Sequence, residues 1–105
     1  MDLLAALIYC EAGNQSEEGK IAVGQVVMNR VNSESFADSI HDVIYESGQF
    51  TPAGSGWLDQ VVGSAPEDCY NAAVAALNGE GTVGDALYFN TGSGQGQKIG
   101  DHQFY

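Results

Sequence analysis

Hydrophobic residues recur at helical spacing through the first half of the chain, whereas the last quarter holds two short aromatic segments. Spacings of three and four residues predict helices, and aromatic runs bounded by glycine predict strands. With 105 residues, the chain can bury one hydrophobic core. We therefore expect a single α+β domain over residues 1–105, with about four helices packed with a small antiparallel sheet.

Capping residues delimit the first two expected helices. The apolar spacing predicts a helix over 2–11, and Gly13 suits a left-handed cap just past its end. Ser16 is a good N-cap for a second helix that runs to about Asn32, with two glutamates in the first turn. Gly24 in this helix would let another element approach closely.

Capping residues and local composition define the middle of the chain. A short third helix is expected over 38–45, with Ser39 as its candidate cap. The segment 47–63 is rich in small and polar residues, which predicts a loop with a short strand around 49–51. Ser64 as an N-cap, with a proline two residues later, predicts a fourth helix that Gly79 ends.

The two aromatic segments, 86–90 and 102–105, are the strand candidates. The stretch 91–101 between them is rich in glycine. The two strands therefore most simply form an antiparallel hairpin around a flexible turn.

The charge balance restricts the possible partners. Fourteen carboxylates face three fixed positive charges, which gives a formal net charge of -11. Such a chain cannot assemble the basic surface that binds nucleic-acid phosphates, and an anionic membrane surface is disfavoured for the same reason. No apolar run approaches the roughly 20 residues that span a bilayer. We therefore expect neither nucleic-acid binding nor membrane insertion.

The sequence also carries little sign of a metal or disulfide framework. Cys10 and Cys69 can form one intramolecular disulfide, or each can be a small buried hydrophobe. His41 and His102 lack the spacing of a metal-binding motif, and the carboxylates are scattered without a calcium loop. We therefore expect no metal and no cofactor.

Glu11 is the most informative residue of the chain. Continuing the helical spacing places its carboxylate on the apolar face of the first helix. Burial there, together with the negative C-terminal end of the helix, would raise its pKa, which is how a general acid is prepared. The alternative is a structural role, in which the carboxylate hydrogen-bonds to Asn14, Gln15 or Arg30 and braces the second helix.

Other polar and aromatic residues are candidates for ligand binding. Gln49, Phe50 and Thr51 combine an amide, a ring and a hydroxyl, a mixture that can hydrogen-bond and stack sugars or peptides. Phe50 could equally pack in the core, and the strand aromatics such as Tyr88 could be ordinary cross-strand pairs. Trp57, in a polar segment, is either a platform for a sugar or the anchor of a lid.

Several motifs, taken in order, resemble one known family. They are LAALIYCEAGNQSEEGKIAVGQ, VVMNRVNS, IHDVIYESGQFTP, ALYFN and IGDHQFY. Over nearly its whole length the chain resembles the cell wall hydrolase family of spore cortex-lytic enzymes, SleB and CwlJ. The resemblance implies a lysozyme-like fold, of the lytic transglycosylase type, that cleaves the glycan strand of peptidoglycan with one essential glutamate.

The resemblance also implies roles for individual residues. The catalytic glutamate of the family falls on Glu11, which would donate a proton to the oxygen of the β-1,4 bond that leaves MurNAc. The positions that would line the substrate groove are Gln49, Phe50, Thr51, Tyr88 and His102. The stretch 91–98 is short and rich in glycine, where many relatives carry a longer aromatic and basic loop.

The reaction course has one preferred form and two alternatives. No second carboxylate is marked by its context, and a lytic transglycosylase needs none, because the C6 hydroxyl of the sugar attacks to give a 1,6-anhydro product. The first alternative is a water-using muramidase with Asp42 or Asp59 as its second group. The second is a non-catalytic glycan-binding module.

The family resemblance also implies a partner and a location. The expected partner is the glycan strand of peptidoglycan, with or without an accessory protein. The expected setting is the cell wall, or the spore cortex lysed during germination. The protein would be exported there by a signal that this chain does not contain.

Overall fold

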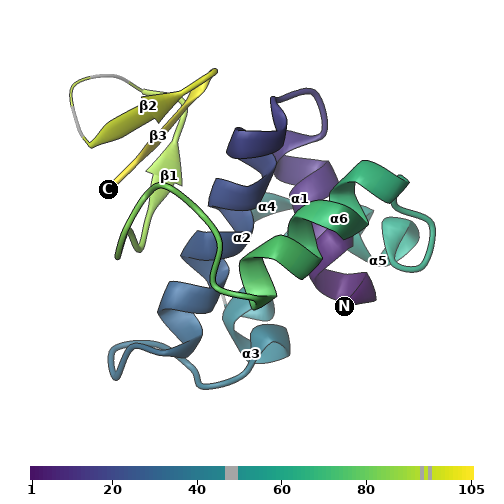
Figure 1. Ribbon diagram of the computed structural model, residues 1–105. Coiled ribbons are helices and arrows are strands. Elements are labelled where there is room, and N and C mark those ends of the chain that lie inside the picture. The colour runs from purple at the N-terminus through teal and green to yellow at the C-terminus, as the bar shows by residue number, and fades with distance from the viewer. Residues whose placement is uncertain (47–49, 93, 95) are drawn as a thin grey trace.

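The structure is a computed structural model that describes residues 1–46, 50–92, 94 and 96–105 (Figure 1). Within these residues the chain forms six helices followed by a three-stranded sheet. The helices are α1 (Asp2–Ala12), α2 (Glu17–Val31), α3 (Ile40–Tyr45), α4 (Thr51–Ser55), α5 (Trp57–Val61) and α6 (Glu67–Leu77). The strands are β1 (Phe89–Asn90), β2 (Gln97–Ile99) and β3 (His102–Phe104). None of the described helices is long and apolar enough to cross a membrane.

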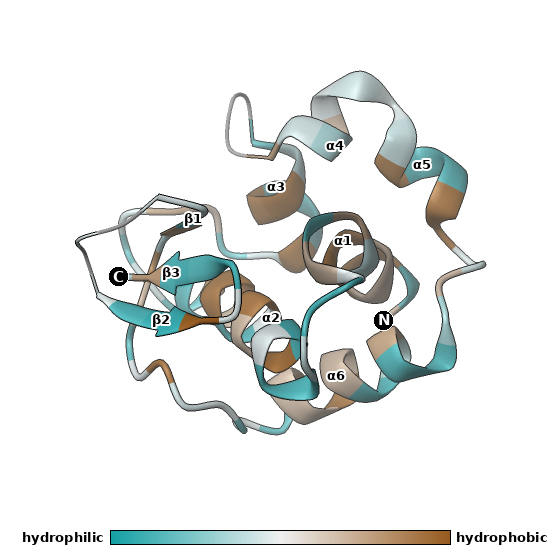
Figure 2. Cartoon of the chain, turned by 90° about the horizontal axis from the view of Figure 1, so that it is seen from above, coloured by the Kyte–Doolittle hydropathy of each residue, from teal (hydrophilic) through white to brown (hydrophobic). Residues whose placement is uncertain are grey.

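The hydrophobic core lies where α1, α2 and α6 pack against one another. Leu4, Leu7 and Ile8 of α1 are fully buried, as the helical spacing of the sequence requires. Gly24 of α2 allows the close approach that the sequence predicts, because a Cβ there would lie 2.7 Å from the Cβ of Ala76 in α6. Figures 1 and 2 show the sheet to one side of these helices, next to α2.

The expected left-handed cap at Gly13 is wrong. Gly13 has φ -59° and ψ -26°, so the backbone stays right-handed after α1. Glycine is needed there for space, because a Cβ would lie 2.6 Å from the carbonyl oxygen of Tyr9 and 3.0 Å from Cδ1 of its ring. The residue therefore lets the Tyr9 ring lie against the backbone.

The serine caps of α2 and α3 are confirmed. The Ser16 hydroxyl accepts a hydrogen bond of 3.2 Å from the N–H of Gly19, and the Ser39 hydroxyl accepts one of 3.1 Å from the N–H of Asp42. Each bond satisfies a backbone donor that the first turn of a helix leaves without a partner.

The expectation of a loop over 47–63 is wrong, because α4 and α5 occupy most of it. Phe50 is extended, but Thr51 already begins α4, so the described part of the predicted strand is a helix start. Pro52 fits the first turn of α4, where its missing N–H costs nothing. Gly56, with φ 86°, separates the two short helices. Gln49 lies outside the described residues.

The start of α6 also differs from the prediction, whereas its end agrees. Pro66 is extended and occupies the N-cap position, while the Ser64 hydroxyl donates to the carbonyl of Val61 instead of capping the helix. Gly79 is left-handed, with φ 86°. The N–H of Gly79 and the N–H of Glu80 donate back to the carbonyls of the last helical turn, which closes the helix.

The sheet contains the predicted antiparallel pair and one additional strand. Phe89 of β1 lies opposite Phe104 of β3, which confirms the pairing of the two aromatic segments. The segment predicted as a flexible turn, however, contains β2, which pairs with the other side of β3. Gly100, with φ 59°, allows the tight turn between β2 and β3. The strand was missed because its two exposed polar residues carry no hydrophobic signal.

Candidate active site

Glu11 lies in the last turn of α1 and is half-buried. Burial penalises its charged form and raises the pKa of the carboxyl above its ordinary value, which confirms the direction expected from the sequence. The two residues that precede and follow it on the apolar face, Ile8 and Ala12, are fully buried. The side chain therefore stands at the boundary between the core and solvent.

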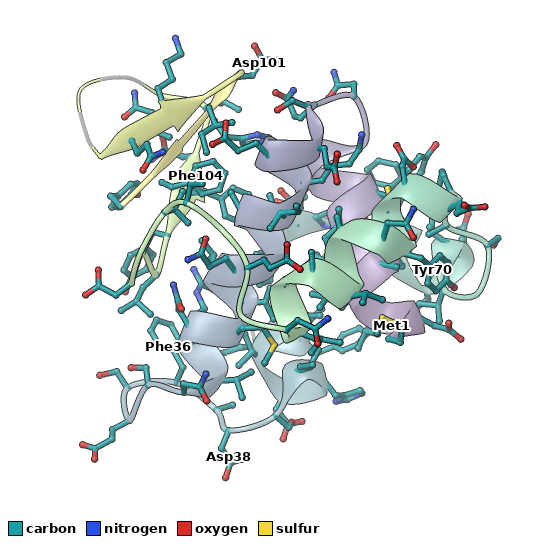
Figure 3. The ribbon with its side chains drawn as sticks, in the orientation of Figure 1. Met1, Phe36, Asp38, Tyr70, Asp101 and Phe104 are labelled. Atoms are coloured by element: carbon teal, nitrogen blue, oxygen red, sulfur yellow. The ribbon has the colours of Figure 1, made fainter. Side chains whose placement is uncertain are left out.

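The Glu11 carboxyl makes no hydrogen bond to any residue that the structure describes. The partners proposed for a bracing role bond elsewhere. Gln15 donates to Asn14 and to Asp101, each at 3.0 Å, and Arg30 Nε donates to the carbonyl of Leu87 at 2.7 Å. Figure 3 shows Asp101 at the tip of the β2–β3 turn. The bracing interpretation of Glu11 is therefore wrong for this structure.

Glu11 borders an open groove of about 340 Å³. The groove is lined by Tyr9, Cys10, Glu11, Gly13, Asn14 and Trp57. No lining side chain is cationic, so no opposite charge in the groove offsets the cost of ionising the glutamate. An acid whose pKa is raised beside an accessible groove is suited to give its proton to a bound substrate.

Trp57 lines this groove together with Tyr9. Its indole ring meets the Tyr9 ring edge to face, with centroids 6.4 Å apart and an interplanar angle of 64°. Both rings are exposed to solvent, Trp57 by 44% and Tyr9 by 37%. The sequence predicts that Trp57 is either a platform for a sugar or the anchor of a lid. The structure places it in the same groove as Glu11.

A second groove of about 490 Å³ is lined by Phe50 and Thr51, together with other residues of α4 and the end of α3. Thr51 is exposed at the first position of α4. Phe50 is only 6% exposed, and its ring packs against Phe89, with centroids 6.0 Å apart. Phe50 therefore packs in the core, as one of the two interpretations predicts, and it also borders the second groove.

Tyr88 and His102 lie in the sheet region and differ in exposure. Tyr88 is exposed and stacks on Tyr105, with centroids 5.6 Å apart. His102 is 6% exposed, and burial lowers the pKa of its imidazole. Its Nδ1 has no hydrogen-bond partner in the described part of the chain. The centroids of the His102 and Phe89 rings lie 5.4 Å apart.

Arg30 joins several of these rings, and sequence reasoning gave it no such role. Its guanidinium carbon lies 5.1 Å from the centre of the Phe50 ring and 5.2 Å from that of Tyr88. The residue is 3% exposed, on the face of α2 that carries the buried valines. That helical spacing was the available signal, because an arginine on an apolar face has to find aromatic or carbonyl partners.

The two carboxylates considered as a second catalytic group lie outside the Glu11 groove. Asp42 hydrogen-bonds to the exposed His41 at 3.1 Å, which holds the pKa of the carboxyl below its usual range. Asp59 accepts a hydrogen bond from the hydroxyl of Tyr45. The lining of this groove therefore offers no support for a second catalytic carboxylate.

Cys10 and Cys69 are both free thiols in this structure. Burial raises the pKa of each to about 11, so both are poor nucleophiles at neutral pH. Among the described residues, no three histidine, cysteine or acidic side chains come together as a metal site.

Sequence comparison finds a family model and several relatives that match most of the chain. The sequence model of the Cell Wall Hydrolase family matches residues 14–105. A spore cortex-lytic enzyme of Oceanobacillus iheyensis is 38% identical over 92 residues, which cover 85% of this chain and 31% of that protein. A spore cortex-lytic enzyme of Bacillus subtilis is 36% identical over 87 residues, covering 83% of this chain and 28% of that protein. The chain thus spans about a third of the length of these relatives.

Solved structures agree with the sequence matches. The catalytic domain of the germination-specific lytic transglycosylase SleB from Bacillus anthracis superposes with a TM-score of 0.85 at 30% identity, over 98% of this chain and 90% of that one. The catalytic domain of the Bacillus cereus SleB protein gives the same TM-score at 31% identity, over 98% of this chain and 86% of that one. The α+β, lysozyme-like fold expected from the resemblance is confirmed by these matches.

Proposed function

The chain belongs to the cell wall hydrolase family, and from this premise we propose that it cleaves peptidoglycan glycan strands as a lytic transglycosylase with Glu11 as its catalytic group. The bond cleaved is the β-1,4 bond between MurNAc and GlcNAc. The 105 residues would act as one catalytic domain. The setting we propose is the spore cortex during germination, which the protein would reach by export, alone or with an accessory protein.

The observation that carries the proposal is the state of Glu11. Its carboxyl is half-buried, its pKa is raised by burial, and it faces a groove without a hydrogen bond to any described residue. A general acid has to be protonated at the working pH and has to have its proton free to give away. The raised pKa of Glu11 favours the protonated form, and no described residue holds its carboxyl in a hydrogen bond.

The first step transfers the Glu11 proton to the glycosidic oxygen. The bond from C1 of MurNAc to that oxygen breaks, GlcNAc leaves with a new hydroxyl, and an oxocarbenium-like sugar remains. The glutamate is now a carboxylate. It can take the proton of the C6 hydroxyl of the same MurNAc while that oxygen bonds to C1, which gives the 1,6-anhydro product and restores the acid.

The composition of the groove supports this course over one that uses water. A two-carboxylate glycosidase needs its second group about 5 to 9.5 Å from the first. Glu11 is the only carboxylate among the residues that line its groove, and Asp42 and Asp59 are bonded elsewhere. The single-glutamate course needs no partner.

We extend the substrate site to the second groove and the sheet. Thr51 and Tyr88 have exposed side chains that a glycan strand can touch. Phe50 and His102 are buried, so they would act by supporting the walls of the site. Gln49, outside the described residues, remains a proposed contact on the strength of the family resemblance.

The test is a digest of purified cortex and vegetative peptidoglycan, with muropeptides identified by mass spectrometry. We expect products that end in 1,6-anhydroMurNAc from the wild type and none from Glu11→Gln. Glu34→Gln is the matched control, because Glu34 is exposed and lies outside the Glu11 groove. Reducing MurNAc ends would indicate a muramidase, and a folded wild type that binds but never cleaves would indicate a binding module.

A further inference from the structure

We infer that Trp57 and Tyr9 together form a stacking platform for a sugar ring of the glycan strand, next to the bond that Glu11 cleaves. This inference deepens the proposed function and rests on it for the identity of the ligand. It adds to the site a binding residue, Trp57, that lies on α5 and outside every motif that carries the family resemblance.

The first support is the position of the two rings. Trp57 comes from α5 and Tyr9 from α1, and both line the groove that contains Glu11. The rings meet edge to face with planes inclined by 64°, so they are not stacked on each other, and each keeps more than a third of its surface exposed. An exposed aromatic face beside a groove is costly to leave in water and is a common sign of a ligand surface.

The second support is that glycines permit the placement of both rings. A Cβ at Gly13 would lie 3.0 Å from Cδ1 and 3.3 Å from Cε1 of Tyr9, so only glycine lets that ring lie where it does. Gly56, at φ 86°, turns the backbone immediately before Trp57. The backbone at Gly13 leaves room for the Tyr9 ring, and the left-handed turn at Gly56 leads into the helix that carries Trp57.

The third support is the chemistry of the other lining residues. No cationic side chain lines the groove, and the only ionisable carboxyl there is one held towards its neutral form. Asn14 accepts a hydrogen bond from Gln15 through Oδ1, which leaves its amide N–H groups for a ligand. An occupant with an apolar face, no charge of its own at this point and acceptor oxygens fits these groups, and a pyranose ring has all three properties.

The experiment uses the fact that Trp57 is the only tryptophan of the chain. Its fluorescence therefore reports on this position alone. The 105-residue Glu11→Gln variant, which should not consume its ligand, is titrated with peptide-free glycan strands released from purified peptidoglycan by an amidase. We expect a saturable change in the intensity or wavelength of the emission. No change at glycan concentrations that saturate binding in a sedimentation assay would overturn the platform, as would a change caused only by the free stem peptides.

Activity assays provide a second, independent readout in the wild-type background. We expect Trp57→Ala to raise KM at least about fivefold with little effect on kcat, and Trp57→Tyr to restore most of the loss. Val74→Ala is the matched control, since Val74 is 44% exposed, as Trp57 is, but lies on α6 away from the groove. An unchanged KM in Trp57→Ala would contradict the inference.

The two proposals fail in distinguishable ways. If glycan changes the Trp57 emission but the wild type cleaves no wall, the catalytic proposal fails and the platform stands. If the wild type releases anhydro products while the emission is unaffected by glycan, the platform fails and the catalytic proposal stands.

Discussion

Lys20 Nζ lies 2.9 Å from Oδ2 of Asp68 and thereby joins the first turns of α2 and α6. The two partners differ in exposure, with 9% of the Lys20 side chain and 59% of the Asp68 side chain open to solvent. The ammonium also donates to the carbonyl of Gln15 at 2.9 Å. The lysine is thus held from both sides at the edge of the core.

This pair predicts an acid-sensitive contribution to stability. The hydrogen bond from Lys20 lowers the pKa of Asp68, so the pair stabilises the fold above the ordinary aspartate pKa of about 4. The contribution is lost as the pH falls through the lowered pKa of the folded state. We expect Asp68→Asn to lower the unfolding temperature at pH 7 and to leave it unchanged near pH 2, as measured by circular dichroism. An equal loss at both pH values would contradict this.

Glu11 should show the opposite dependence on pH. Its pKa is raised in the folded state, so its ionisation destabilises the fold as the pH rises from the ordinary glutamate value of about 4.3 through the raised one. We therefore expect the unfolding temperature of Glu11→Gln, relative to wild type, to increase between pH 4 and pH 7. Cleavage by the wild type should fall as the pH rises through the raised pKa. A relative stability that does not vary with pH would contradict the burial of this carboxyl.

The contact between Gly24 and Ala76 predicts a large effect from one methyl group. Gly24→Ala would bring two Cβ atoms to 2.7 Å, which forces α2 and α6 apart and should destabilise the fold by about 1–3 kcal/mol. Gly54→Ala is the control, because a Cβ at this helical glycine meets nothing within 4 Å. We expect Gly54→Ala to be neutral or to stabilise by up to about 1 kcal/mol. Urea unfolding of both variants tests the comparison.

His102 should be replaceable by an apolar ring without loss of stability. Its Nδ1 is buried without a partner among the described residues, and a group in that state costs about 1–3 kcal/mol. Phe89 and Phe104 surround the imidazole with rings. We expect His102→Phe to unfold at a higher urea concentration than wild type at pH 7.

The same variant should remove one source of acid sensitivity. Burial lowers the pKa of His102, so its contribution is present above the ordinary value of about 6.5 and is lost as the pH falls through the lowered value. The advantage of His102→Phe over wild type should therefore grow below pH 6.5. A variant that is less stable than wild type at every pH would show that the imidazole has a partner in solution.

Local signals predicted the parts of the fold that depend on neighbouring residues. Ser16 and Ser39 cap their helices within one turn, and a serine followed by a helical run predicts such a bond directly. The expected loop over 47–63 failed because α4 and α5 have five residues each, too few for a hydrophobic period to be visible. β2 was missed because its place depends on pairing with β3, which no local feature of 97–99 reveals.

The candidate site likewise contains one residue that local spacing identifies and others that only tertiary packing brings together. Glu11 was found from the sequence because its position relative to the other apolar residues of α1 is a local property. The other residues of the groove could not be identified from local spacing. Trp57, for example, lies on a helix more than forty residues away from Glu11 in the sequence. The contact of Arg30 with Phe50 and Tyr88 likewise depends on how α2 meets α4 and the sheet.

The central place of β3 has a consequence for synthesis on the ribosome. β1 and β2 do not pair with each other, since β3 lies between them. As the chain emerges, the backbone groups of β1 and β2 have no strand to pair with until residues 102–104 follow. By then α1, α2 and α6 can already have packed against one another. The helical part can thus form as a nascent unit, and the aromatic surface of the sheet is completed only afterwards, in a single event.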